Sequence, residues 1–146
     1  MMRAILAVFG AMALAATVAT ADEFERVPPV TNQAVLKECG ACHLAYQPRL
    51  LPADSWRRLF DRLDDHFGED ASLDDTIRAE ILAYYVAGAA RQVPAEGAPL
   101  RITELSWWTR AHRPGEVREA DWARAKFKGN CTACHRRAEQ GIYEDD

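Results

Sequence analysis

The sequence predicts an all-α protein with two small helical lobes, and three observations support this fold class. Apolar residues recur at helical spacing in several stretches of the chain. A Cys-x-x-Cys-His pentad occurs twice, at residues 39–43 and at 131–135. Between the pentads, residues 93–99 contain two prolines and a glycine, a composition typical of a connection between lobes.

The two pentads account for all the cysteines of the chain, namely Cys39, Cys42, Cys131 and Cys134. Two thiols at this spacing can form thioether bonds with the two vinyl groups of one porphyrin, and the adjacent histidine then lies beneath the iron as its proximal ligand. A purely structural disulfide pair does not explain why a histidine follows each motif. The pentads therefore predict two covalently bound haem c groups, one in each lobe, with His43 and His135 as proximal ligands.

The N-terminal residues have the pattern of an export signal. Arg3 precedes an apolar, alanine-rich run over 4–19, and Ala19-Thr20-Ala21 matches a small-x-small cleavage site. The run is too short to favour a membrane-spanning helix, and an uncleaved anchor is the alternative. We therefore expect a periplasmic protein with no transmembrane segment after signal cleavage.

The expected organisation is a signal peptide at 1–21, an N-terminal haem lobe at 22–92, a linker at 93–99 and a C-terminal haem lobe at 100–146. The acidic tail over 139–146 is expected to fray. The formal net charge is −4, and no basic stripe indicates nucleic acid as a partner. Basic patches on other redox proteins suit an acidic protein better.

In the N-terminal lobe, a first helix over 31–43 is expected to carry both thiols of its pentad on one face. A loop over 44–52 follows and wraps around the haem. Asp54 or Ser55 then caps a second helix, which ends at Gly68.

Within that second helix, His66 follows Leu63 by three residues and is predicted to face the apolar interior. Ser72 has capping-box spacing to Asp75 and opens a third helix, which finishes before Pro94. Gly88 lies inside this pattern, where a close helix crossing, a contact with the haem edge or a fraying last turn explains it.

The C-terminal lobe begins with a short helix from Thr103 or Ser106 to His112. A further helix is expected from about Glu119, with a kink at Gly129-Asn130 before the second pentad. Aromatic side chains in both lobes are interpreted as packing against porphyrin rather than as electron relays.

Composition limits the distal ligands of the two irons. All three methionines, Met1, Met2 and Met12, lie in the signal segment, so the mature chain has none for His/Met ligation. Only His66 and His112 remain as further imidazoles. Ligation of both irons by two histidines uses every histidine of the protein.

Spacing favours pairing His66 with His43 and His112 with His135, since each pair is separated by 23 residues. Crossed pairing remains open, and so does a surface position for either distal histidine. A lysine could also replace a distal histidine, but a buried lysine must first lose its proton. The candidates are Lys37, Lys126 and Lys128.

Residues 38–66 and 106–135 resemble the small bacterial dihaem cytochrome c family, on the two pentads, Leu63-Asp64-Asp65-His66 and the segment from Trp107-Trp108 to His112. The first lobe is similar to a class I cytochrome c, with His66 where that class places methionine. Pro48 resembles the class I proline whose carbonyl accepts the Nδ1–H of the proximal histidine.

The resemblance implies electron transfer, with a small oxygen-binding monohaem cytochrome and a membrane cytochrome b as partners. The residues themselves favour an electron carrier rather than an enzyme, because iron with two imidazoles has no open position, and the absence of methionine predicts low potentials. The alternatives are a small haem enzyme or gas-binding cytochrome in which one distal histidine dissociates, and a thiol–disulfide redox protein.

The charge distribution predicts the order of the two haem potentials. Residues 22–92 carry 13 acids and 8 bases, whereas residues 110–137 carry eight bases and three acids. Positive charge near a haem favours its reduced state, so we expect the C-terminal haem to have the higher potential. Potentiometric titration of single-haem variants checks this order, and the reverse order contradicts it.

Overall fold

The computed structural model describes residues 25–91 and 97–144. This part of the chain consists of helices and turns and contains no β-strand, which confirms the all-α prediction. The α-helices are α1 (Gln33–Glu38), α2 (Ala53–Phe60), α3 (Asp75–Gly88), α4 (Ser106–Ala111) and α5 (Glu119–Ala125). Short 3₁₀ turns η2 to η6 lie between and after them, at Pro48–Leu50, Leu63–Asp65, Ile102–Glu104, Cys131–Ala133 and Ala138–Gln140.

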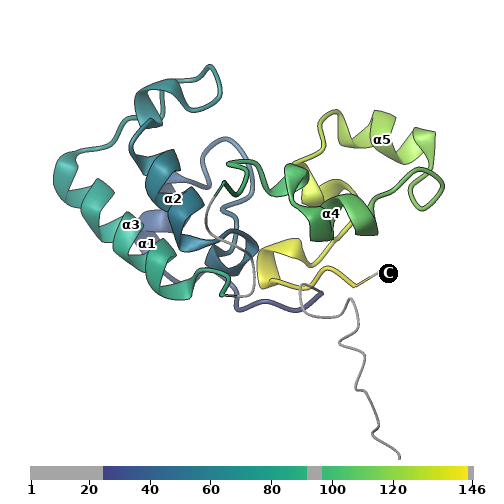
Figure 1. The fold of residues 1–146 in the computed structure, drawn as a ribbon, viewed down its shortest axis with the longest axis horizontal. Coiled ribbons are helices and arrows are strands. Elements are labelled where there is room, and N and C mark those ends of the chain that lie inside the picture. Colours follow the sequence, from purple (N-terminus) through teal and green to yellow (C-terminus); the bar gives the residue numbers. More distant parts are fainter. Residues whose placement is uncertain (1–24, 92–96, 145–146) are drawn as a thin grey trace, which may run out of the picture.

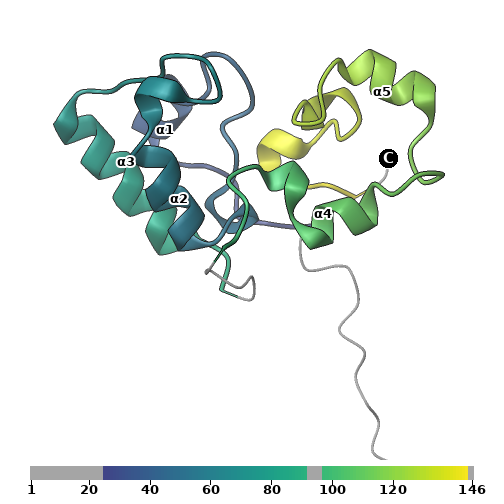
Figure 2. The ribbon, with the colours of Figure 1, turned by 45° about the horizontal axis from the view of Figure 1, so that its top comes forward.

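The helices form two groups in space. In Figures 1 and 2, α1, α2 and α3 lie together on one side, and α4, α5 and the C-terminal segment lie on the other. One cluster of buried apolar side chains nevertheless runs from Val27 in the first group to Trp108 in the second. The signal peptide and most of the predicted linker lie outside the described residues, so the lobe boundary stays a prediction. No described helix has the length and apolar character needed to cross a membrane.

Helix α1 is shorter than predicted. It begins after Asn32, whose side chain accepts a hydrogen bond from the Val35 N–H, and it ends with Cys39 as its C-cap. The prediction that one helix carries both thiols is therefore wrong, because Cys42 lies in the turn that follows. A Cβ on Gly40 would clash with the Leu36 carbonyl oxygen, so glycine permits this close turn.

Helix α2 also ends early. Its N-cap is Pro52, so neither predicted cap residue is correct. The helix stops at Phe60, and His66 lies in a turn beyond it rather than on a helical face. Asp65 stabilises the turn around His66, because its side chain accepts a hydrogen bond from the Gly68 N–H at 3.1 Å.

Helix α3 begins two residues later than the predicted capping box, with Asp74 as the N-cap accepting from the Thr76 N–H. It ends at Gly88, before Pro94 as expected. A Cβ on Gly88 would lie 2.8 Å from Cβ of Pro48 in η2. The contact with Pro48 supports the close crossing, and Gly88 is also the last residue of the helix.

The second group follows the prediction closely at its helix starts, with α4 beginning at Ser106 and α5 at Glu119. The break after α5 comes earlier than expected, at Lys126, whose φ of 68° is left-handed. The Asn130 side chain takes over a carbonyl at the helix end by donating to Ala125 O at 3.0 Å.

The C-terminal segment is not frayed over its described part, which corrects the prediction for residues up to 144. Tyr143 N donates to Glu25 O at 2.7 Å, and Val27 N donates to Gly141 O at 2.9 Å. Arg26 pairs with Glu144 at 2.5 Å. These contacts fasten the chain end to the start of the first group.

We expect Gly88→Ala to lower the free energy of unfolding by about 1–3 kcal/mol, because the rigid Pro48 ring cannot yield to the added methyl group. Urea titration of the holoprotein measures this. Ala87→Ser, at the neighbouring exposed position of α3, is the control and should change stability by less than ~0.5 kcal/mol. Equal effects of the two substitutions would contradict the crossing argument.

Candidate haem sites

The first pair of histidines comes from the turn after α1 and the turn after η3. The rings of His43 and His66 have centroids 6.3 Å apart and planes 23° from parallel. His43 Nδ1 lies 2.7 Å from the Leu44 carbonyl oxygen. Because this carbonyl can only accept, Nδ1 carries the proton and Nε2 carries the lone pair that binds a metal.

The predicted role of Pro48 as the acceptor for His43 is wrong. The Pro48 carbonyl instead accepts from Trp56 Nε1 at 2.8 Å. The acceptor is the carbonyl of the residue immediately after the histidine, a position that the class I pattern does not suggest. The tight turn after Gly40 is what brings that carbonyl within reach of the ring.

His66 is held differently from His43. Its Nδ1 is buried and has no hydrogen-bond partner within the described structure. Burial lowers the pKa of His66, and the nearby His43 and Arg101 lower it further, which favours the neutral, ligating form. Phe67 packs edge-on at 5.0 Å and is itself covered by the Arg101 guanidinium, 3.8 Å from its centroid.

The second pair comes from the end of α4 and the turn after η5. The rings of His112 and His135 have centroids 6.1 Å apart, with planes 80° apart. His112 Nδ1 lies 3.0 Å from the Trp108 carbonyl oxygen, and the Trp108 ring stacks on the imidazole at 4.2 Å and 9°. An open hollow of about 360 Å³ adjoins His112, between Trp122 of α5 and Lys128.

Both separations suit a metal between the rings. Two metal–nitrogen bonds of about 2 Å, with ~1.1 Å from each nitrogen to its ring centre, put the centroids of trans imidazoles roughly 6 Å apart. Among the described residues, no group of three or more His, Cys, Asp or Glu side chains is placed to hold a bare ion. A porphyrin supplies the four further nitrogen ligands that the chain does not.

Two cysteines precede the pentad histidine of each pair, Cys39 and Cys42 before His43, and Cys131 and Cys134 before His135. Cys39 and Cys131 are half-buried, whereas Cys42 and Cys134 are exposed. Burial raises the pKa of Cys39 and raises that of Cys131 to about 11. A thiol–disulfide site does not explain the histidine that follows each pair of cysteines, so the donor set fits haem attachment better.

Each predicted site residue thus lies in one of two clusters, and the structure brings His43 to His66 and His112 to His135. Sequence reasoning missed the supporting groups, namely the Leu44 and Trp108 carbonyls and the Tyr46 ring, which stacks on His43 at 4.9 Å. The position of Trp108 four residues before His112, on one helical face, is the signal that could have identified it.

A helical fold with facing imidazole pairs beside two Cys-x-x-Cys pentads defines a c-type cytochrome with two haems. The sequence model of one family, described as dihaem cytochrome c, matches residues 35–143. The chain belongs to this dihaem cytochrome c family, and it carries two covalently bound haem c groups.

Solved structures agree with this assignment. A diheme cytochrome c from Rhodobacter sphaeroides is 42% identical, with a TM-score of 0.74, over 80% of this chain and 99% of that one. A structure of DHC purified from Rhodobacter sphaeroides is 47% identical, with a TM-score of 0.71, over 78% and 98%. A diheme cytochrome type c from Shewanella baltica OS155 is 37% identical, with a TM-score of 0.65, over 77% and 87%. The search of curated proteins found no match.

Proposed function

We propose that this protein is an exported electron carrier that works in the periplasm through two low-potential haems, each with two histidine ligands. His43 and His66 hold the first iron, and His112 and His135 hold the second. The observation that carries the proposal is the separation of the two ring pairs, 6.3 and 6.1 Å, which suits an iron between each pair. The export signal and the membership of the family support the location and the redox role.

When bound, haem iron supplies one-electron Fe(III)/Fe(II) chemistry. The chain fixes the ligands around it. The carbonyls of Leu44 and Trp108 hold the tautomers of His43 and His112, so that the ligating nitrogens are oriented before each electron arrives. Two strong-field ligands with fixed positions require little rearrangement when the oxidation state changes, and they leave no position for a substrate.

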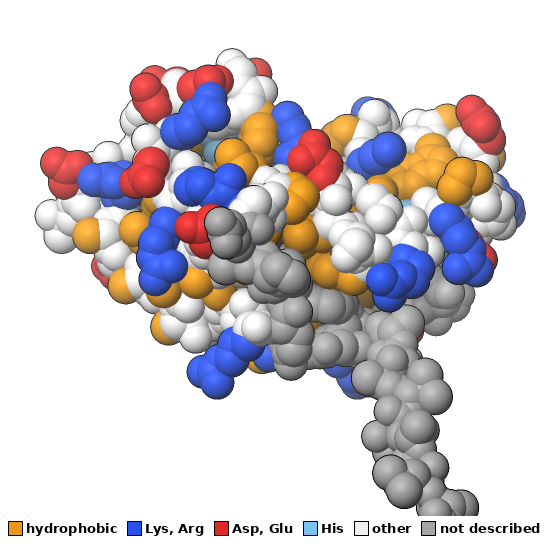
Figure 3. Space-filling model, in the orientation of Figure 1, with side chains coloured by type: hydrophobic (Ala, Val, Ile, Leu, Met, Phe, Trp, Pro, Cys, Tyr) orange, Lys and Arg blue, Asp and Glu red, His pale blue; other side chains and the backbone are white. Residues whose placement is uncertain are grey.

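The surface charge indicates where partners bind. All eight bases between residues 110 and 137 are exposed, and Figure 3 shows Lys and Arg side chains around the hydrophobic surface of the second group. The first group is acidic. Because complementary charge steers redox proteins together, a basic partner suits the first group and an acidic partner the second. A small oxygen-binding monohaem cytochrome and a membrane cytochrome b are the proposed partners.

Electron paramagnetic resonance of the oxidised protein tests the ligation. Nearly parallel imidazole planes split the iron d orbitals that bond to them, whereas perpendicular planes leave them almost degenerate. We expect only low-spin signals, a rhombic one from the first haem and a more anisotropic one with a larger maximum g value from the second.

The variant His112→Met should change only the more anisotropic signal, and His66→Met only the rhombic one. These substitutions assign each signal to its site. A high-spin signal in the untreated protein would show that one iron lacks its second imidazole, and it would overturn the proposed ligand set.

A gas-binding cytochrome is the second candidate, and one observation tells which iron it would use. His112 is held by a carbonyl and by a stacked ring, whereas His66 Nδ1 has no partner in the described structure and the next residue, Phe67, has a left-handed φ of 59°. A left-handed φ in a bulky residue is strained, and a histidine without an outer hydrogen bond is a weaker ligand. His66 is therefore the distal ligand that dissociates more readily.

We expect carbon monoxide to leave the visible spectrum of the fully reduced protein unchanged, as for an electron carrier with both irons closed. As the urea concentration rises, but below the concentration that unfolds the protein, we expect a carbon monoxide adduct to form first at the first haem. Single-haem variants, Cys39→Ala/Cys42→Ala and Cys131→Ala/Cys134→Ala, assign the change. An adduct that forms at once without urea would favour the gas-binding candidate, and one that forms first at the second haem would contradict the stated difference between His66 and His112.

A further inference from the structure

Tyr46 connects the two haem sites. Its ring stacks on the proximal His43 of the first site, with centroids 4.9 Å apart and planes 24° from parallel. Its hydroxyl donates to the Gly129 carbonyl oxygen at 2.8 Å, 83 residues away in the sequence. The same oxygen accepts from the backbone N–H of Cys131 at 2.9 Å. One tyrosine and one carbonyl therefore lie between the ligand of the first iron and the cysteine that carries the second haem.

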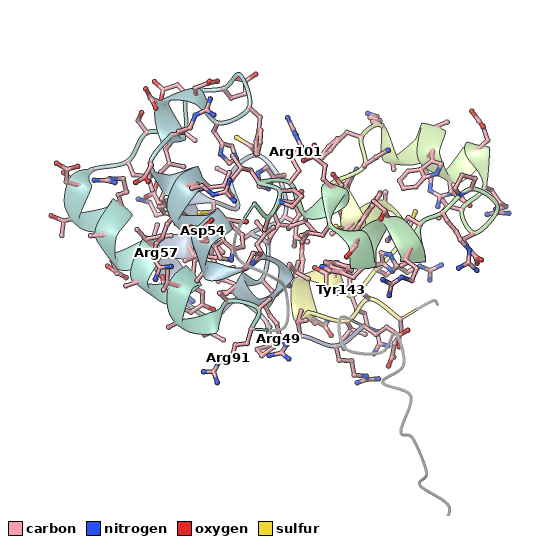
Figure 4. The ribbon with its side chains drawn as sticks, in the orientation of Figure 1. Arg49, Asp54, Arg57, Arg91, Arg101 and Tyr143 are labelled. Carbon is pink, nitrogen blue, oxygen red and sulfur yellow. The ribbon has the colours of Figure 1, made fainter. Side chains whose placement is uncertain are left out.

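Gln47 and Tyr143 provide a second connection beside the first. Gln47 is fully buried, its amide donates to Ala138 O at 2.7 Å, and its carbonyl accepts from the Tyr143 hydroxyl at 2.5 Å. The Tyr143 ring packs edge-on against the proximal His135 of the second site, with centroids 5.6 Å apart. Figure 4 shows Tyr143 near the junction of the two groups of helices.

The close approach at Gly129 depends on glycine. A Cβ there would lie 2.6 Å from the Tyr46 hydroxyl oxygen. Glycine at this position therefore lets the Tyr46 hydroxyl reach the backbone of the other group. The Gly129 carbonyl oxygen accepts from both the Tyr46 hydroxyl and the Cys131 N–H.

We propose that Tyr46, with the parallel route through Gln47 and Tyr143, carries the electronic coupling by which the two haems exchange electrons. This inference rests on the proposed electron-transfer function and on His43 and His135 as iron ligands. Electron exchange falls steeply with distance, and bonds and hydrogen bonds transmit it better than gaps between unbonded groups. The first route runs from His43 through the Tyr46 ring and hydroxyl to the Gly129 carbonyl. The second runs from His135 through the Tyr143 ring and hydroxyl to Gln47, which is bonded to Tyr46 along the backbone.

The step itself is balanced without further reactants. One Fe(II) is oxidised to Fe(III) while the other Fe(III) is reduced to Fe(II). No bond forms or breaks, and both tyrosines keep their hydroxyl protons and are never themselves oxidised. The tyrosines act as a fixed medium between the two sites, not as intermediate carriers.

The test compares Tyr46→Phe, Tyr143→Phe and the double variant, all as holoproteins. Phenylalanine keeps each ring against its histidine and removes only the hydroxyl hydrogen bond. Pulse radiolysis delivers a single electron, and the change in absorbance then reports the rate at which it equilibrates between the haems. We expect Tyr46→Phe to slow this rate several-fold and the double variant to slow it further, with both haem potentials nearly unchanged.

Tyr84→Phe is the matched control, because the Tyr84 hydroxyl bonds only within the first group, accepting from Thr31 N at 3.2 Å. It should leave the exchange rate at the wild-type value. Wild-type exchange in Tyr46→Phe would overturn the proposal even if stability falls, since the contact would then be structural only. If the double variant does not fold, Tyr46→Phe alone decides. Failure of the proposed ligation would be visible separately, as a high-spin signal in the wild-type protein.

Discussion

Two pairs of imidazole rings organise the structure, His43 with His66 and His112 with His135, with ring centroids 6.3 and 6.1 Å apart. None of the four histidines lies inside a helix. His43 and His66 lie in turns, His112 is the C-cap of α4, and His135 follows η5. Helix α4 ends at His112, its C-cap, whereas α1, α2 and α5 end several residues before the next histidine of the chain. A helix end also exposes carbonyls that have no partner further along the helix, and the carbonyl of Trp108 near such an end holds the ring of His112.

The two sites hold their histidines in different ways. In the second, the His112 ring stacks on Trp108, its Nδ1 lies 3.0 Å from the Trp108 carbonyl oxygen, and the Trp122 ring lies at 6.0 Å. In the first, the Leu44 carbonyl holds His43, whereas His66 lies in a turn beside Phe67, whose φ is left-handed and whose ring is covered by the Arg101 guanidinium. The angle between ring planes differs as well, 23° against 80°. The surroundings of the two pairs therefore differ although all four residues are histidines.

The two groups of helices are also fastened to each other. A buried glutamine between them has both ends of its amide bonded, and the chain end folds back onto the first described residues. Leaving such a buried amide unpaired would cost about 1–3 kcal/mol, so its bonds oppose any separation of the groups. The apolar cluster that crosses the same junction adds to this. Together these contacts oppose a change in the separation of the two haem sites.

The sequence by itself determined the chemistry of this protein. Four cysteines in two pentads define the attachment sites, and His66 and His112 are the two histidines outside the pentads. The helix starts at Ser106 and Glu119 were also predictable, because caps and apolar spacing are local properties. The contacts around the histidines were not predictable from the sequence. The turn that puts His66 opposite His43, the carbonyl of Leu44 in place of that of Pro48, and the contacts of Tyr46 and Gln47 with the second group were decided by tertiary structure. These contacts join residues far apart in the sequence, such as His43 with His66 and Tyr46 with Gly129. They depend on the path of the backbone after each helix, which no local sequence pattern encodes.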